Sequence, residues 1–125
     1  MKTLLLIEDD ESIAEVLVLL LSTRGYEVKH YYDFETLQQF SDAVNNLKPH
    51  LIISDVFLPH IDGRELCKYL KAKEGFKKVP YLLYSAGNLS EKEIQESCGD
   101  MFLRKPFDLP VFEQAIQSLA STNYN

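Results

Sequence analysis

The sequence has little of what marks several classes of protein. Its 125 residues include no hydrophobic run near the roughly 20 residues that span a membrane. Lys and Arg number 13 against 19 Asp and Glu, and the net charge of -6 argues against a nucleic-acid-binding surface. A strand-like segment starts within the first few residues, which leaves no room for a signal peptide. We therefore expect a cytoplasmic domain that contacts neither nucleic acid nor membrane.

Cysteine is also scarce. Cys67 and Cys98 are far apart in the sequence and match neither the C-x-x-C motif nor the spacing of zinc ligands. Cytosolic thiols are normally kept reduced. We therefore expect two free, reduced thiols that are buried or half-buried.

Hydrophobic residues make up 46% of the chain, which is enough for one domain with a full core. Five short strand-like segments alternate with stretches of helical periodicity. Apolar strands with helices between them indicate a parallel sheet covered on both faces. We expect a single domain over residues 1–121 and a polar C-terminal tail over 122–125. The predicted strands are Leu4–Ile7, Glu27–Tyr31, Leu51–Ser54, Tyr81–Tyr84 and Met101–Leu103.

Apolar residues spaced three and four apart predict helices between these strands. Asp10 is expected to cap the first helix and Gly25 to end it, while Asp33 is expected to cap the second. A short polar helix is predicted near 90–97. The expected inward positions of the other helices are Ile13, Val16, Leu17, Leu20 and Leu21; Leu37, Phe40, Val44 and Leu47; Leu66, Cys67 and Leu70; and Phe112, Ala115, Ile116 and Leu119.

Polar residues capable of chemistry follow four of the five predicted strands. The carboxyl ends of parallel strands meet at one edge of a sheet, so these side chains are expected to converge. Helix capping is the simpler explanation for the acids after the first strand, and it suits Asp10 best. The residues are Glu8, Asp9 and Asp10 after the first strand, Asp55 at the end of the third, Ser85 after the fourth and Lys105 after the fifth.

Crowded carboxylates repel one another and stay ionised only if a cation joins them. Oxygen ligands with open positions suit Mg²⁺, which binds one or two carboxylates together with a phosphate. Such an ion neutralises charge on an incoming phosphoryl group, so that a carboxylate can attack it and form an aspartyl phosphate. A lysine supplies a compact positive charge and a serine supplies one hydrogen bond to the phosphoryl oxygens.

Along essentially its whole length the chain resembles the receiver domains of two-component response regulators. The resemblance implies an α/β, flavodoxin-like (βα)5 doubly wound sandwich with a five-stranded parallel sheet in the order 2-1-3-4-5. The chain departs from the family in two ways. Ser85 stands where threonine is usual, and the segment from Ser85 to Lys105 is shorter than in many members. The matching motifs are Ile7-Glu8-Asp9-Asp10, Ser54-Asp55 with Pro59 and Gly63, Tyr84-Ser85-Ala86, and Lys105-Pro106-Phe107.

The resemblance also implies roles for these residues. Asp55 would accept a phosphoryl group from a phosphohistidine on a sensor histidine kinase or a histidine phosphotransfer protein. Asp9 and Asp55 would bind Mg²⁺ directly, together with the backbone carbonyl of Phe57, and Glu8 would act mainly through water. Phosphorylation would then switch a surface that an output protein or domain reads, and it would favour a homodimer in some members.

Three further residues complete the implied mechanism. Lys105 would bridge Asp55 and later the phosphoryl oxygens, and its bond to Pro106 is often cis in the family. Ser85 would move to hydrogen-bond the phosphoryl group. Phe102 would be the aromatic side chain that rotates in the switch, although its periodicity alone marks it as a core residue.

Two other functions stay open. A receiver-like interaction module that is never phosphorylated is the first. Such a module could lose Asp55, Ser85 and Lys105 freely, so their presence argues against it. A Mg²⁺-dependent phosphatase is the second, but it would need an acid where Phe57 stands. We expect self-phosphorylation and self-dephosphorylation with no separate substrate, in a stand-alone receiver or a fragment of a longer regulator.

Overall fold

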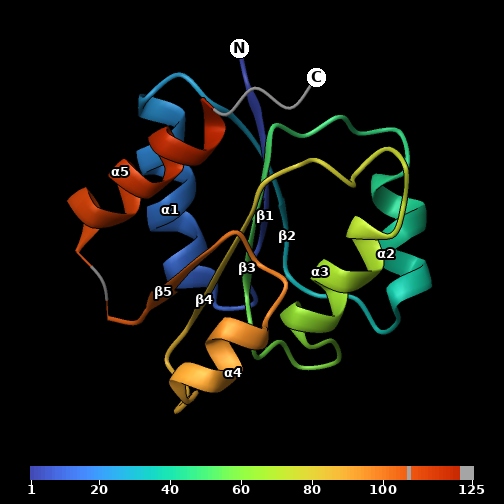
Figure 1. Ribbon diagram of the computed structural model, residues 1–125. Coiled ribbons are helices and arrows are strands. Elements are labelled where there is room, and N and C mark those ends of the chain that lie inside the picture. The colour runs from blue at the N-terminus through green and yellow to red at the C-terminus, as the bar shows by residue number, and fades with distance from the viewer. Residues whose placement is uncertain (107, 122–125) are drawn as a thin grey trace.

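The computed structural model describes residues 1–106 and 108–121 (Figure 1), so Phe107 and the predicted tail 122–125 lie outside the described residues. Five parallel strands form one sheet in the order β2-β1-β3-β4-β5. This confirms the predicted flavodoxin-like α/β fold. The strands are β1 Thr3–Ile7, β2 Glu27–Tyr31, β3 Leu51–Asp55, β4 Tyr81–Ser85 and β5 Met101–Arg104.

Helices cover both faces of the sheet. Figure 1 shows α1 and α5 on one face, α2 and α3 on the other, and α4 beside the lower ends of β4 and β5. Their bounds are α1 Glu11–Thr23, α2 Leu37–Val44, α3 Gly63–Lys71, α4 Glu91–Glu96 and α5 Leu109–Ala120. No helix within 1–106 and 108–121 has the length and apolar character needed to cross a bilayer.

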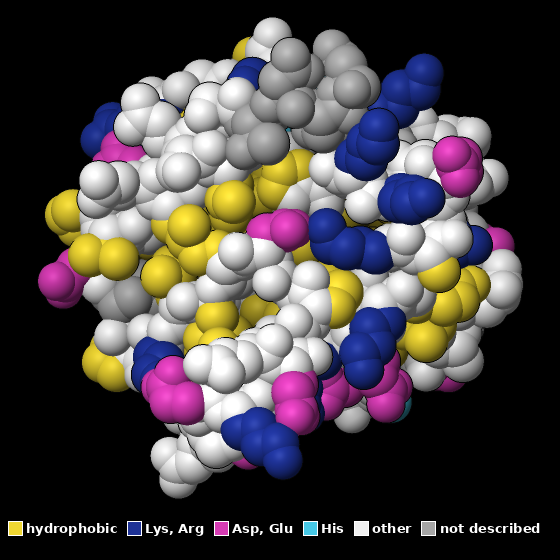
Figure 2. Space-filling model, viewed as in Figure 1, with side chains coloured by type: hydrophobic (Ala, Val, Ile, Leu, Met, Phe, Trp, Pro, Cys, Tyr) yellow, Lys and Arg dark blue, Asp and Glu magenta, His cyan; other side chains and the backbone are white. Residues whose placement is uncertain are grey.

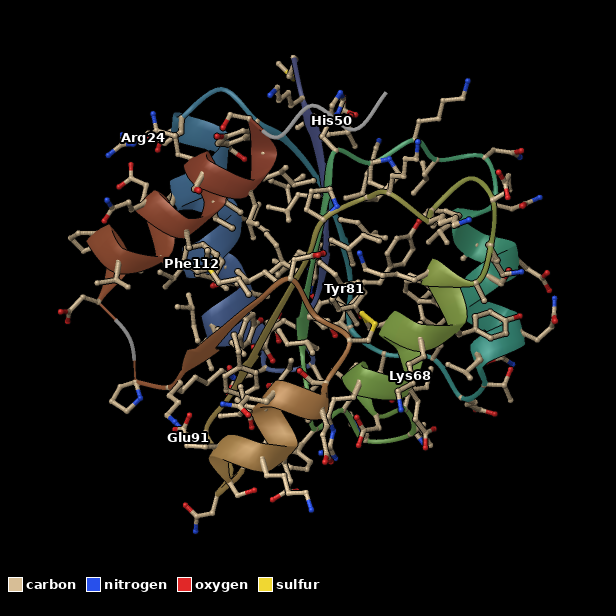
Figure 3. All side chains as sticks on the ribbon, viewed as in Figure 1. Arg24, His50, Lys68, Tyr81, Glu91 and Phe112 are labelled. Carbon is tan, nitrogen blue, oxygen red and sulfur yellow. A yellow bond between two sulfur atoms is a disulfide. The ribbon has the colours of Figure 1, made fainter. Side chains whose placement is uncertain are left out.

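The side chains of each central strand alternate between two cores, because successive residues of a strand point to opposite faces. In β4, Tyr81 and Leu83 join the core under α2 and α3, whereas Leu82 and Tyr84 join the core under α1 and α5. Phe112 extends from α5 toward the sheet in the second core (Figure 3). This alternation decides on which face of the sheet each side chain of β4 lies.

The ends of α1 follow the predictions. The Asp10 carboxylate accepts a hydrogen bond from the backbone N–H of Ile13, and Gly25 has a φ of 89°, which suits the turn after a helix. The predicted inward face of α1 was wrong at Val16, which is 49% exposed, whereas Ala14 is buried. The buried stripe of α1 is therefore rotated slightly from the predicted one.

The predicted cap of α2 was wrong. Thr36 caps this helix, since its hydroxyl accepts a hydrogen bond from the backbone N–H of Gln39. Asp33 instead pairs with His60, with 2.6 Å between Oδ2 and Nδ1. Both residue types cap helices well, and α2 begins at Leu37, so Thr36 and not Asp33 stands in the capping position.

The short polar helix was predicted correctly. α4 has a capping box, in which the Ser90 hydroxyl accepts from the backbone N–H of Glu93 and the Glu93 carboxylate accepts from that of Ser90. None of its residues is buried. Ile94 is the residue of α4 that packs, partly buried, against the core under α2 and α3.

The expectation of two free thiols was wrong. Cys67 in α3 and Cys98 between α4 and β5 form a disulfide, with their Cα atoms 6.1 Å apart (Figure 3). Cys67 lies on the inward face of α3, as its helical spacing predicted, and Cys98 packs against the same core. The fold therefore joins two cysteines that are 31 residues apart in the sequence.

Candidate functional site

Three carboxylates meet at the carboxyl edge of the sheet. Glu8 and Asp9 follow β1, Asp55 ends β3, and these two strands are neighbours in the sheet. One oxygen from each carboxylate lies within 4.8 Å of the other two. Glu8 and Asp55 are buried and Asp9 is exposed, so the cluster opens to solvent on one side. The structure thus brings together the three acids that the sequence predicted as ligands.

Lys105 joins this acid cluster from the end of β5. Its Nζ lies 2.9 Å from Asp55 Oδ2 and 3.2 Å from Glu8 Oε1. Burial lowers the pKa of Lys105, but the hydrogen bond and the charge of Asp55, with those of Glu8, outweigh burial and leave the pKa raised. The peptide bond to Pro106 is cis, as the resemblance implied. Lys105 is therefore a charged bridge between two of the carboxylates.

Glu8 is fully buried, and burial raises the pKa of its carboxyl despite three donors that favour the anion. Its Oε2 accepts from the backbone N–H of Asp10 at 3.1 Å, and its Oε1 accepts from Lys105. The third donor is the hydroxyl of Tyr84, 2.8 Å from Oε1. Sequence reasoning missed Tyr84, although its place next to Ser85 on a strand was a usable signal.

Ser85 and Phe57 lie beside Asp55. The Ser85 side chain is buried, and its Oγ accepts a hydrogen bond from the backbone N–H of Gly87 at 2.9 Å. The backbone N–H of Phe57 donates to Asp55 Oδ1 at 3.1 Å. These contacts place both residues at the edge where the sequence predicted them.

The Phe57 ring covers Gly87. The ring is 51% exposed, and a methyl group added at Gly87 would lie 2.3 Å from its Cε2. The guanidinium of Arg64 stands 5.7 Å from the ring centroid, and Asp62 holds that guanidinium through Nε and Nη2. Phe57 therefore forms an apolar cover beside the acid cluster.

The turn after β3 is packed tightly against Asp55. A Cβ at Gly63 would lie 2.2 Å from the backbone carbonyl oxygen of Asp55. Only glycine fits there, which explains the Gly63 of the sequence motif. The backbone N–H of Gly63 donates to the carbonyl of Val56, which closes the turn.

Phe102 does not join the acid cluster. It lies on β5 next to Leu83 of β4, half-buried against the core under α2 and α3. On the face shown in Figure 2, hydrophobic side chains gather over the region of β5 and α5, and Lys and Arg side chains lie over α3. The position predicted for the switch is thus on an apolar face, apart from the acids.

The donor set suits a hard cation such as Mg²⁺. It consists of carboxylate oxygens from Glu8, Asp9 and Asp55 with one open side, and Mg²⁺ prefers oxygen ligands and retains several waters. No histidine or cysteine belongs to this group, so its chemistry does not match that of a zinc site.

Fold and site together define a receiver domain, and the chain belongs to the response regulator receiver domain family, whose model matches residues 4–117. The DNA-binding dual master transcriptional regulator RpaA of Synechocystis is 32% identical over 121 residues, covering 95% of this chain and 49% of that protein. The polar-differentiation response regulator DivK of Brucella ovis is 28% identical, with 94% of each chain covered.

Solved structures agree with this assignment. The receiver domain of a signal transduction histidine kinase from Syntrophus aciditrophicus has a TM-score of 0.84 and 27% identity, covering 97% of this chain and 91% of that one. This chain spans about half the length of the first transcriptional regulators it matches. Phosphorylation and Mg²⁺ binding are typical of the family.

Proposed function

We propose that this domain is the phosphoacceptor of a two-component phosphorelay, with Asp55 as the phosphorylated residue. The observation that carries the proposal is Lys105, which bridges Asp55 and Glu8 beside the exposed Asp9. An ammonium group that already contacts Asp55 is close enough to move to the negatively charged oxygens of a phosphoryl group on that residue. The phosphoryl group would come from a histidine kinase or a histidine phosphotransfer protein in the cytoplasm.

In the proposed reaction a carboxylate oxygen of Asp55 forms a bond to phosphorus while the bond from phosphorus to the imidazole nitrogen breaks. The electron pair of that bond leaves with the imidazole. Lys105 moves from Asp55 to a phosphoryl oxygen, and Ser85, whose Oγ accepts from Gly87 in the free protein, turns its hydroxyl proton to another. Mg²⁺ held by Asp9, Asp55 and the Phe57 carbonyl, with Glu8 acting through water, would neutralise charge on the phosphoryl group.

The domain would catalyse its own phosphorylation and hydrolysis and transmit the change to an output protein or domain. A receiver-like module that is never phosphorylated is the alternative; the ion pair of Lys105 with Asp55 and the buried Ser85 support the phosphoacceptor instead. Incubation with acetyl phosphate and Mg²⁺, followed by intact mass measurement, separates the two. We expect one added phosphoryl group with Mg²⁺ and none in its absence; no addition under either condition contradicts the proposal.

Replacing Asp9 with Asn is expected to weaken Mg²⁺ binding by more than about tenfold, which is what the loss of even an outer-shell partner can cost. The metal-free variant should also melt at a higher temperature, because one of three clustered negative charges is gone. Calorimetric titration and thermal melting measure the two effects. Asp10→Asn is the control, since asparagine also caps a helix. Equal Mg²⁺ affinity in Asp9→Asn and the parent contradicts direct ligation.

Phosphorylation is expected to draw Ser85 toward the phosphoryl group and to let Phe102 rotate from its half-buried position to a buried one. A phenylalanine has no hydroxyl to anchor it in solvent, so we expect the inward rotamer to be partly populated without phosphate. Amide shifts on adding beryllofluoride and Mg²⁺ should concentrate on α4, β5 and α5. Shifts confined to α2 and β2 contradict this readout face.

A further inference from the structure

We propose that Tyr84 is a positioning residue of the acid cluster, whose hydroxyl keeps Glu8 in place when Lys105 leaves it for the phosphoryl group. The inference rests on the Mg²⁺-dependent function proposed above. It assigns a task to the buried hydroxyl of Tyr84, a residue to which the sequence analysis gave no role.

The sheet places Tyr84 where it can act. It is the direct partner of Asp55 in the ladder between β3 and β4, and the backbone N–H of Val56 donates to its carbonyl. Its side chain lies on the face of α1 and α5, and its hydroxyl reaches the carboxyl end of β1, where it donates to Glu8 Oε1 at 2.8 Å. Tyr84 thus links the acceptor strand to the buried acid.

The need for this hydroxyl follows from the sharing of Lys105. The ammonium group is divided between Asp55 at 2.9 Å and Glu8 at 3.2 Å, and phosphorylation of Asp55 draws it toward the phosphoryl oxygens. A buried carboxylate that loses its cationic partner is strongly disfavoured unless other donors remain. Tyr84 and the backbone N–H of Asp10 are the donors that stay with Glu8.

The Tyr84 ring also contacts Lys105. The Nζ atom stands 4.7 Å from the ring centroid, which is a cation–π contact. Phenylalanine preserves this contact and removes only the hydroxyl. The Tyr84→Phe variant therefore isolates the hydrogen bond to Glu8.

The same strand contains a matched control. Tyr81 is also fully buried, but it faces the opposite core and its hydroxyl donates to the carbonyl of Gly63 at 3.3 Å. Tyr81→Phe removes a buried hydroxyl from β4 without touching Glu8. A difference between the two variants reports the position of the hydroxyl rather than the general cost of losing one.

The test is a titration of Mg²⁺ into the metal-free full chain, followed by amide chemical shifts around the cluster. Tyr84→Phe is expected to lower the Mg²⁺ affinity by about tenfold, as the loss of a group that orients a ligand does. Tyr81→Phe should bind Mg²⁺ as the parent does. Equal loss in both variants, or no loss in Tyr84→Phe, overturns the positioning role.

A double-mutant cycle with Glu8→Gln shows whether Tyr84 acts through Glu8. The effect of Tyr84→Phe should largely disappear in the Glu8→Gln background; an undiminished effect overturns the inference. The ring chemical shifts of labelled tyrosines test the same link without a substitution at position 84. Glu8→Gln should change the ring shifts of Tyr84 and leave those of Tyr81 unchanged. Absence of Mg²⁺ binding by the parent chain contradicts the proposed function itself, whereas failure of the variants alone contradicts only the role of Tyr84.

Discussion

Asp55→Asn is expected to abolish phosphorylation by acetyl phosphate completely, while the parent chain gains one phosphoryl group. The carboxamide has no anionic oxygen to attack phosphorus, and it also gives up the ion pair with Lys105. Intact mass after incubation with Mg²⁺ measures the result. The other acids are poorly placed to replace Asp55, because Glu8 is fully buried and Asp9 is at the exposed side of the cluster.

The control for this experiment is Asp10→Asn, which removes a neighbouring acid but keeps a side chain that can cap α1. It should gain one phosphoryl group as the parent does. Labelling of Asp55→Asn to the same extent as the parent would place the acceptor elsewhere.

Phe57→Asn is expected to shorten the lifetime of the phosphorylated form by up to about 10²-fold. This is the rate enhancement that a positioned proton acceptor or donor can give in general acid–base catalysis. Hydrolysis needs a water in line with the phosphorus, and the half-exposed Phe57 ring offers no hydrogen bond to hold it. Gly87, which the ring covers, has no side chain that could hold the water instead. The parent should therefore lose its phosphoryl group slowly for a receiver, which suits sustained output.

The matched control for this prediction is Phe57→Leu, which keeps an apolar cover but has no polar group. Its decay rate should stay near that of the parent, measured as the loss of phosphoryl mass after the donor is removed. If Phe57→Asn decays no faster than Phe57→Leu, the approach of water is controlled at another position.

The arrangement of these residues was predictable because each stands at the carboxyl end of a strand or just after it, and parallel strands end at one edge. Asp9, Asp55 and Lys105 could be brought together by topology alone. Their number and order along the chain then sufficed to indicate the family. The identity of the polar groups, rather than any knowledge of their contacts, carried that part of the prediction.

Other features depend on packing between elements that are distant in the sequence. Tyr84 resembles any aromatic core residue until the register of β4 directs its hydroxyl to Glu8. The bond between Cys67 and Cys98 requires α3 to lie beside the segment before β5, which no local spacing reveals. The contact of Asp33 with His60 likewise joins two loops that are distant in the sequence, while Thr36 caps α2.

The contact between Phe57 and Gly87 affects the order in which these positions can change during evolution. Any side chain at 87 would meet the Phe57 ring, and the ring, which is half exposed, would have to shift to admit it. A first substitution at Gly87 would thus change phosphoryl lifetime through Phe57, whatever residue is introduced. Once a small residue occupies position 57, position 87 would vary independently. On the proposed function, the effects of substitutions at 57 and 87 on the lifetime would therefore not be additive.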